Sequence, residues 1–115
     1  MSDLKKRIEA PRVDWLDRQQ IIRDLEGIED VIRRQGWLQG MLGRPGGPRC
    51  IRGAIYEVID GYALGCADRV RRTVNAMGFV SETALVRFND TPGRTKDDVL
   101  ARVQEAKATF AKGGR

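Results

Sequence analysis

Residues 14–36 have the sequence DWLDRQQIIRDLEGIEDVIRRQG, and this stretch decides the fold. Its large apolar side chains recur at intervals of four, three and four residues, the spacing of one helix face: Ile21, Leu25, Ile28 and Ile32. Asp14 is a suitable N-cap. Gly36 is a suitable stop, because glycine readily adopts the left-handed conformation that ends many helices. We therefore predict one long helix over residues 14–35, with Trp37 folded back onto it.

The same helical spacing resumes after a loop rich in glycine and proline at residues 38–49. Further helices are predicted over residues 50–59 and 66–77, over a short segment after the N-cap Ser81, and over residues 96–111. Thr95 and Asp98 have the spacing of a capping box for the last of these. The sequence thus predicts an all-α fold: a single compact domain of about five helices over residues 14–112, with residues 1–13 as a flexible N-terminal arm.

The spacing also predicts which residues form the core. They are the apolar residues that share one face of each segment: Ile21, Leu25, Ile28, Ile32, Ala54, Val70, Val74, Leu85, Val99, Val103 and Phe110. Cys66 begins an apolar series on its helix, so we expect its thiol to be buried. Two cysteines do not make a disulfide framework in a chain of this length, so Cys50 and Cys66 are both expected to be reduced.

Composition excludes several classes of protein. The chain has 115 residues, of which 41% are hydrophobic and 32% charged, and it contains no histidine. Histidine is the commonest general base and metal ligand, so we expect no metal, no cofactor and no histidine-activated nucleophile. The sequence has no signal-peptide pattern and no apolar run of membrane-spanning length. We therefore expect a cytoplasmic protein without membrane contact; enzymatic activity stays open, and a non-enzymatic role is favoured.

Positive charge is dispersed along the sequence. The formal net charge is +5, and arginine supplies 16 of the 21 basic residues. A dedicated nucleic-acid binder usually gathers its basic residues on one face, so this spread favours an ordinary solvated surface. The candidates for phosphate contact are Arg69, Arg71 and Arg72. At helical spacing they flank Val70 on two sides and do not form one clamp, so we expect their joint replacement by alanine to affect the fold little.

Short motifs on both sides of the two loops carry a resemblance to a known family. They are a tryptophan followed by Gln39 and Gly40, then Cys50, Gly53, Ala54 and Ile55, then Asn89, Asp90, Arg94, Thr95, Val99 and Leu100. Over roughly residues 17–106 the chain resembles an uncharacterised family of small bacterial and phage proteins, known only as a domain of unknown function. It departs from that pattern at Arg49 and Phe88, where the resemblance implies an aromatic residue and a tryptophan. The resemblance implies no established activity, substrate or cofactor.

The resemblance does imply that Trp37, Cys50, Asn89, Asp90 and Arg94 lie close together. The candidate binding residues are therefore Trp37, Gln39, Cys50, Arg52, Asn89, Asp90 and Arg94. Structural roles are open for several of them. Trp37 is also expected to pack on the first helix, and Cys50 to act as a small buried apolar residue. Asn89 and Asp90 can order the turn that follows, with Asp90 and Arg94 as a local ion pair.

Three functions remain open at this point. The favoured one is an accessory binding or regulatory module that acts through protein–protein contacts, as a monomer or homodimer. Its candidate surface is the 38–49 loop together with Arg69, Arg71 and Arg72. The second is nucleic-acid binding through the dispersed arginines. Residues 81–111 resemble a helix-turn-helix in outline, but Asp97 and Asp98 would repel phosphate groups. The third is a small enzyme that uses Cys50, although no histidine is present to transfer the leaving-group proton.

Overall fold

The computed structural model describes residues 15–59 and 66–112, except for the side chains of Trp15 and Leu16. These residues form α2 (Trp15–Gln35), α3 (Ile51–Ile59), α4 (Ala67–Ala76), α5 (Glu82–Asp90) and α6 (Lys96–Ala111). Within the described ranges the only β-type pairings are isolated bridges. The predicted all-α fold is therefore confirmed. The predicted arm at residues 1–13 and the N-cap Asp14 lie outside the described residues.

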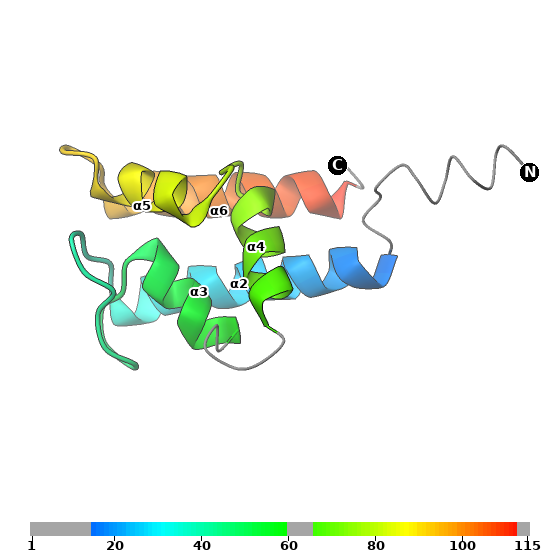
Figure 1. Cartoon of the computed structure of the whole chain (residues 1–115), viewed down its shortest axis with the longest axis horizontal. Helices are drawn as coiled ribbons and strands as arrows, with labels where there is room; N and C mark the ends of the chain where they lie inside the picture. Colours follow the sequence, from blue (N-terminus) through cyan, green and yellow to red (C-terminus); the bar gives the residue numbers. More distant parts are fainter. Residues whose placement is uncertain (1–14, 60–65, 113–115) are drawn as a thin grey trace, which may run out of the picture.

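The two long helices set the frame of the molecule. Helices α2 and α6 lie side by side along its long axis, α5 runs in nearly the same direction as α6, and α3 and α4 are inclined to them (Figure 1). Helix α3 packs on α2 and also contacts α5, and α4 contacts α2, α3 and α5. As a result, the loop between α2 and α3 and the turn between α5 and α6 meet at the same end of the molecule.

The core lies where the helices face one another. All of the predicted core residues are buried, from Ile21 on α2 to Phe110 on α6. Trp37 is partly buried and packs against this cluster. Removal of these apolar side chains from water is the main favourable contribution to the stability of such a fold.

The helix ends also follow the predicted local chemistry. Gly36 ends α2 with a φ of 100°, a left-handed conformation that glycine adopts without strain. The Ser81 side chain accepts a hydrogen bond from the Ala84 N–H at the start of α5. Thr95 and Asp98 form both hydrogen bonds of the capping box at the start of α6. These caps fix where the chain turns, and so they fix the positions of the two loops.

One burial prediction was wrong. Cys66 is only partly buried, because it lies at the N-cap of α4, ahead of the turn whose apolar side faces the core. Cys50 is buried, at 5% exposure, and both thiols are free of disulfide bonds.

This difference in burial predicts the order in which the thiols react. With native protein and a small alkylating reagent, we expect Cys66 to be labelled faster than Cys50, because a buried thiol must wait for local opening. Mass spectrometry of the labelled peptides over time measures both rates. In denaturant the two rates should become similar. Faster labelling of Cys50 in the native protein would contradict the packing described here.

Candidate functional site

The side chain of Asn89 joins the two loops. It lies at the end of α5 and is 1% exposed. Its Oδ1 accepts hydrogen bonds from Trp37 Nε1 at 2.6 Å and from the Ile51 backbone N–H at 3.1 Å. Its Nδ2 donates to the Leu38 carbonyl at 3.1 Å and to Asp90 Oδ1 at 2.9 Å. An asparagine side chain has two donors and two acceptor positions, so Asn89 is fully occupied and holds the loop in place.

Gln39 and Gly40, which follow Trp37 and Leu38 in the loop, bind the same end of α5. Gln39 Nε2 donates to the carbonyl oxygens of Asn89 at 2.9 Å and Thr91 at 3.0 Å. The backbone N–H of Gly40 donates to Asp90 Oδ1 at 3.0 Å. The last carbonyl groups of a helix lack partners within the helix, and the loop supplies donors for them. The first half of the loop is therefore fixed to α5.

A buried arginine holds the second half of the loop. Arg49 is 5% exposed, and its Nη2 donates to the Gly53 carbonyl at 2.7 Å. Its Nε lies 3.6 Å from the carboxylate of Glu57, which also accepts hydrogen bonds from Gln35 Nε2 and the Gly46 N–H. A Cβ atom at Gly53 would collide with Arg49 Nε and with a loop carbonyl oxygen, so the close approach requires glycine. Arg49 thus fills the position where the resemblance implied an aromatic residue.

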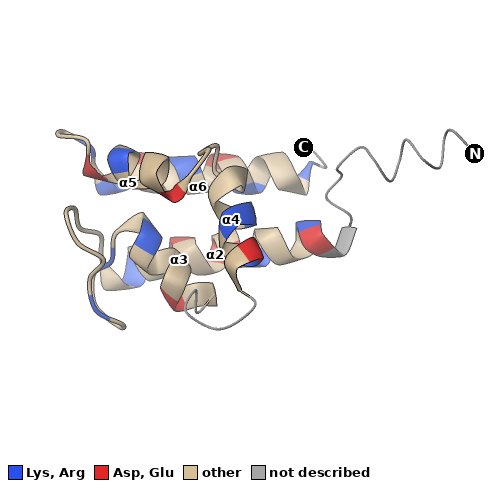
Figure 2. Cartoon of the chain, in the orientation of Figure 1, with Lys and Arg blue, Asp and Glu red and all other residues tan. Residues whose placement is uncertain are grey.

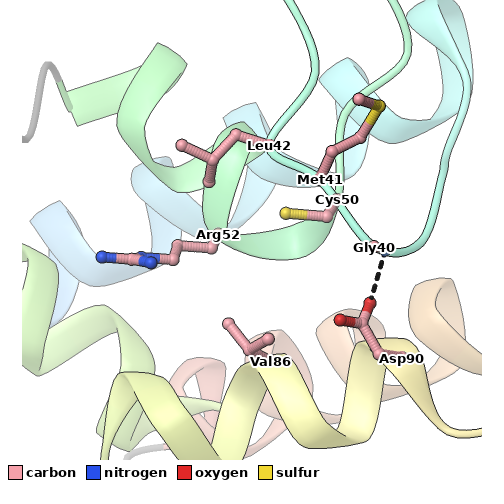
Figure 3. Close-up of a pocket in the computed structure, with 7 residues that line it drawn as sticks. All are labelled: Gly40, Met41, Leu42, Cys50, Arg52, Val86 and Asp90. Atoms are coloured by element: carbon pink, nitrogen blue, oxygen red, sulfur yellow. Dashed lines mark hydrogen bonds between the residues drawn. The ribbon is translucent and has the colours of Figure 1, made fainter.

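A pocket lies between the loop, the start of α3 and α5 (Figure 3). Its volume is about 170 Å³, and its walls are formed by Gly40, Met41, Leu42, Cys50, Arg52, Val86 and Asp90. The sulfur of Cys50 points into the pocket and accepts a hydrogen bond from the Gly53 N–H at 3.3 Å. Arg52 and Asp90 lie on different sides of it. The pocket therefore combines an apolar interior with one cationic and one anionic wall.

The cationic wall belongs to a polar cluster that connects α3 to α5. Arg52 Nε donates to Glu82 at 2.9 Å and to the Tyr56 hydroxyl at 3.2 Å, and this hydroxyl donates to Glu82 at 2.6 Å. Burial raises the pKa of the Tyr56 phenol, and its hydrogen bond to Glu82 raises the pKa further. A shallow depression of about 270 Å³ continues the pocket along α5, past Arg52 and Val86. The cluster thus fixes the distance between the two helices that line the pocket.

Met41 separates this pocket from another on the outside of the loop. The outer pocket has a volume of about 330 Å³, and it is lined by Leu38, Met41, Gly43, Arg44, Gly47 and Pro48. Met41 lines both pockets and is 64% exposed. Sequence reasoning named the loop but not this residue. The available signal was a large flexible apolar side chain within a segment that otherwise consists mostly of glycine, proline and arginine.

The structure brings most of the candidate binding residues together at this end of the molecule. Those that meet around the loop are Trp37, Gln39, Cys50, Arg52, Asn89 and Asp90. Arg94 lies at the edge, where its Nε donates to the Phe88 carbonyl at 2.9 Å. Among the described residues, Asp90 forms no ion pair with Arg94 and instead accepts from the Gly40 N–H. The interpretation of Asp90 and Arg94 as a local ion pair was therefore wrong.

The three arginines proposed for phosphate contact each have a carboxylate partner in the chain. The pairs are Arg69 with Asp24, Arg71 with Asp68, and Arg72 with Asp17. Arg69 binds Asp24 with two nitrogens, at 2.9 and 2.6 Å, and these hydrogen bonds raise the pKa of Arg69. The Asp24 side chain is only 3% exposed. Arg69 therefore joins α4 to a buried carboxylate of α2, and for this one of the three arginines the structure leads us to expect that replacement by alanine destabilises the fold.

Positive charge does not gather in one segment of the described chain. Basic and acidic residues are interspersed along the helices of the described part of the chain (Figure 2). Within residues 15–59 and 66–112, no group of histidine, cysteine and acidic side chains has the arrangement of a metal site. None of the helices there combines the length and the hydrophobicity of a membrane span.

The model of a family of unknown function, DUF6197, matches residues 17–109 of the chain. The chain belongs to DUF6197. The expectation that the chain belongs to a family of unknown function is thereby confirmed, and the DUF6197 match includes both the 38–49 loop and the turn that meets it. A search of curated proteins and a search of solved structures each gave no match.

Both positions at which the chain departs from the motifs of the resemblance, Arg49 and Phe88, have a local structural role. Arg49 is buried under the loop, as described above. Phe88 is partly buried against the core and packs on Phe79, with ring centroids 5.2 Å apart.

Proposed function

We propose that this protein is a non-enzymatic binding module that recognises a protein partner through the 38–49 loop and the adjoining face of α5. The main support for this proposal is the position of Met41. An exposed apolar side chain is common on protein surfaces, but Met41 lies between two pockets on a loop that is fixed at both ends. A fixed loop loses little conformational entropy on binding, which favours association. Methionine also adapts its shape to varied apolar surfaces.

The surroundings of Cys50 support binding more than catalysis. Its thiol is buried, and its sulfur already accepts a hydrogen bond from the Gly53 N–H. A cysteine nucleophile commonly depends on a neighbouring base, and the sequence contains no histidine. In the proposed role Cys50 forms part of the apolar interior of the pocket.

Nucleic-acid binding has less support. Phosphate contact by Arg69, Arg71 or Arg72 would compete with the carboxylate partner that each of these arginines has. The interspersed acidic residues also reduce the attraction to a polyanion. We expect at most weak binding to duplex DNA, without sequence preference and steeply reduced by salt.

A charge at Met41 tests the protein-binding proposal. We expect Met41→Glu to weaken binding of the partner about 30-fold, because the few residues that dominate a protein interface each contribute about 2 kcal/mol or more, and the proposal makes Met41 one of them. The wild-type protein and the variant are each tagged and purified from the native host. Bound proteins are quantified by mass spectrometry, and the affinity is then measured with the purified partner.

Val80→Glu is the matched control. Val80 is 91% exposed and lies in the turn before α5, away from both pockets. It receives the same new charge, and we expect it to retain the partner. Circular dichroism and thermal melting should be the same for both variants. Equal retention of partners by the two variants would exclude the loop as the contact surface.

A further inference from the structure

Two arginines stack on a single phenylalanine ring at the junction of α5 and α6. The guanidinium carbon of Arg94 lies 3.9 Å from the Phe88 ring centroid, and that of Arg102 lies 4.7 Å from it. Arg102 also lies 5.0 Å from the Phe79 ring centroid. Both guanidinium groups therefore lie close to the same aromatic ring. Neither residue is fully buried.

Backbone carbonyl groups hold both guanidinium groups in place. Arg94 Nε donates to the Phe88 carbonyl at 2.9 Å, and Arg102 Nη1 donates to the Met77 carbonyl at 3.2 Å. A guanidinium has five N–H donors, so most donors of both groups remain available. The stacking and these hydrogen bonds together restrict the side chains before any ligand arrives.

Neither arginine has a carboxylate partner within residues 15–59 and 66–112. Of the eleven other arginines in these ranges, seven do have one: Arg33, Arg34, Arg49, Arg52, Arg69, Arg71 and Arg72. Two positive charges that share one ring repel each other, and a bound anion would remove this repulsion. An oxyanion in reach of both guanidinium groups would accept charge-assisted hydrogen bonds from each.

We propose that Arg94 and Arg102 form a binding site for a phosphate monoester or free phosphate. Two guanidinium groups match the charge of such a dianion. A nucleic-acid strand fits less well, because the adjoining helix α6 also carries Asp97, Asp98 and Glu105, and Glu105 lines the small pocket beside Arg102. These carboxylates would repel a long polyanion that extends past the two arginines, whereas a compact dianion can avoid them. This site is independent of the one proposed around Met41.

Calorimetric titration at neutral pH with inorganic phosphate, adenosine monophosphate, dimethyl phosphate and a short single-stranded oligonucleotide tests the proposal. We expect saturable binding of the first two, and at least about tenfold weaker binding of dimethyl phosphate, which carries a single charge. Tighter binding of the monophosphate than of free phosphate would identify an ester as the ligand, and the reverse order would identify the free ion. Binding of the oligonucleotide alone, or no saturable binding at physiological ionic strength, would overturn the proposal.

Four variants locate the binding. We expect Arg94→Gln and Arg102→Gln each to weaken phosphate binding at least about tenfold, with Arg23→Gln as the control because Arg23 is exposed on α2. Arg94→Lys keeps the charge but loses the planar fork, so we expect it to bind almost as weakly as Arg94→Gln. Thermal melting shows whether each variant is folded. Equal weakening by the α2 control, or full binding by Arg94→Gln, would contradict the assignment.

Discussion

Replacement of Asn89 by alanine is expected to lower the free energy of unfolding by about 4 kcal/mol. The change removes the partners of Trp37 Nε1, the Ile51 N–H and the Leu38 carbonyl at once. A buried polar group left without a partner costs about 1–3 kcal/mol, and the lower end of this range applies to Trp37 and Leu38, whose hydrogen bonds are only partly buried. A small domain has only about 5–15 kcal/mol of stability in total, so this loss is large. Urea denaturation followed by circular dichroism measures it.

Two further variants separate the hydrogen bonds from loss of the side chain in general. Asn75→Ala removes an exposed asparagine from α4, and we expect a change within about 0.5 kcal/mol. Asn89→Asp keeps the shape but replaces the Nδ2 donor with an oxygen that faces the Asp90 carboxylate, now 2.9 Å from Nδ2. It should therefore be destabilised as well. A loss below about 1 kcal/mol in Asn89→Ala would show that the loop is held by other contacts.

The fold was predictable because it depends on local spacing. The interval of apolar residues on α2 identifies a helix face without knowledge of what that face packs against. The caps at Gly36, Ser81 and Thr95 are local as well, since each involves residues within one turn. Cys66 was predicted wrongly because the spacing includes it in a helix that begins one residue later.

The candidate site was only partly predictable, because its contacts join distant parts of the chain. Trp37 and Asn89 are 52 residues apart, and no spacing rule relates them. The family resemblance implied that they are close, but not that Asn89 uses all of its hydrogen-bonding groups. The same limit applies to Arg69 and Asp24, which are 45 residues apart. In the sequence Arg69 resembles its neighbours Arg71 and Arg72, and only the fold distinguishes it from them.

We expect Arg69→Ala to lower the free energy of unfolding by about 3 kcal/mol, the second largest effect among the variants proposed. The variant leaves the Asp24 carboxylate buried between α2 and α4, with Gln20 Nε2 as its one remaining donor at 3.1 Å. Removal of one partner from a fully buried ion pair costs about 3–5 kcal/mol. Arg69 is 34% exposed, so water can partly reach the space it leaves, and the lower end of that range applies. Chemical denaturation measures the change.

Arg71→Ala on the same helix is the matched control. Arg71 and Asp68 are both more than two-thirds exposed, and such surface pairs contribute about 0–1 kcal/mol. The double variant Asp24→Asn with Arg69→Ala should recover part of the loss, because no charge is then left buried without a partner. If the two arginine variants lose the same stability, or if the double variant is no more stable than Arg69→Ala, burial of Asp24 is not the cause. We expect instead that the fold requires Arg69 and not Arg71, because Arg69 is the partner of the buried Asp24 carboxylate on α2.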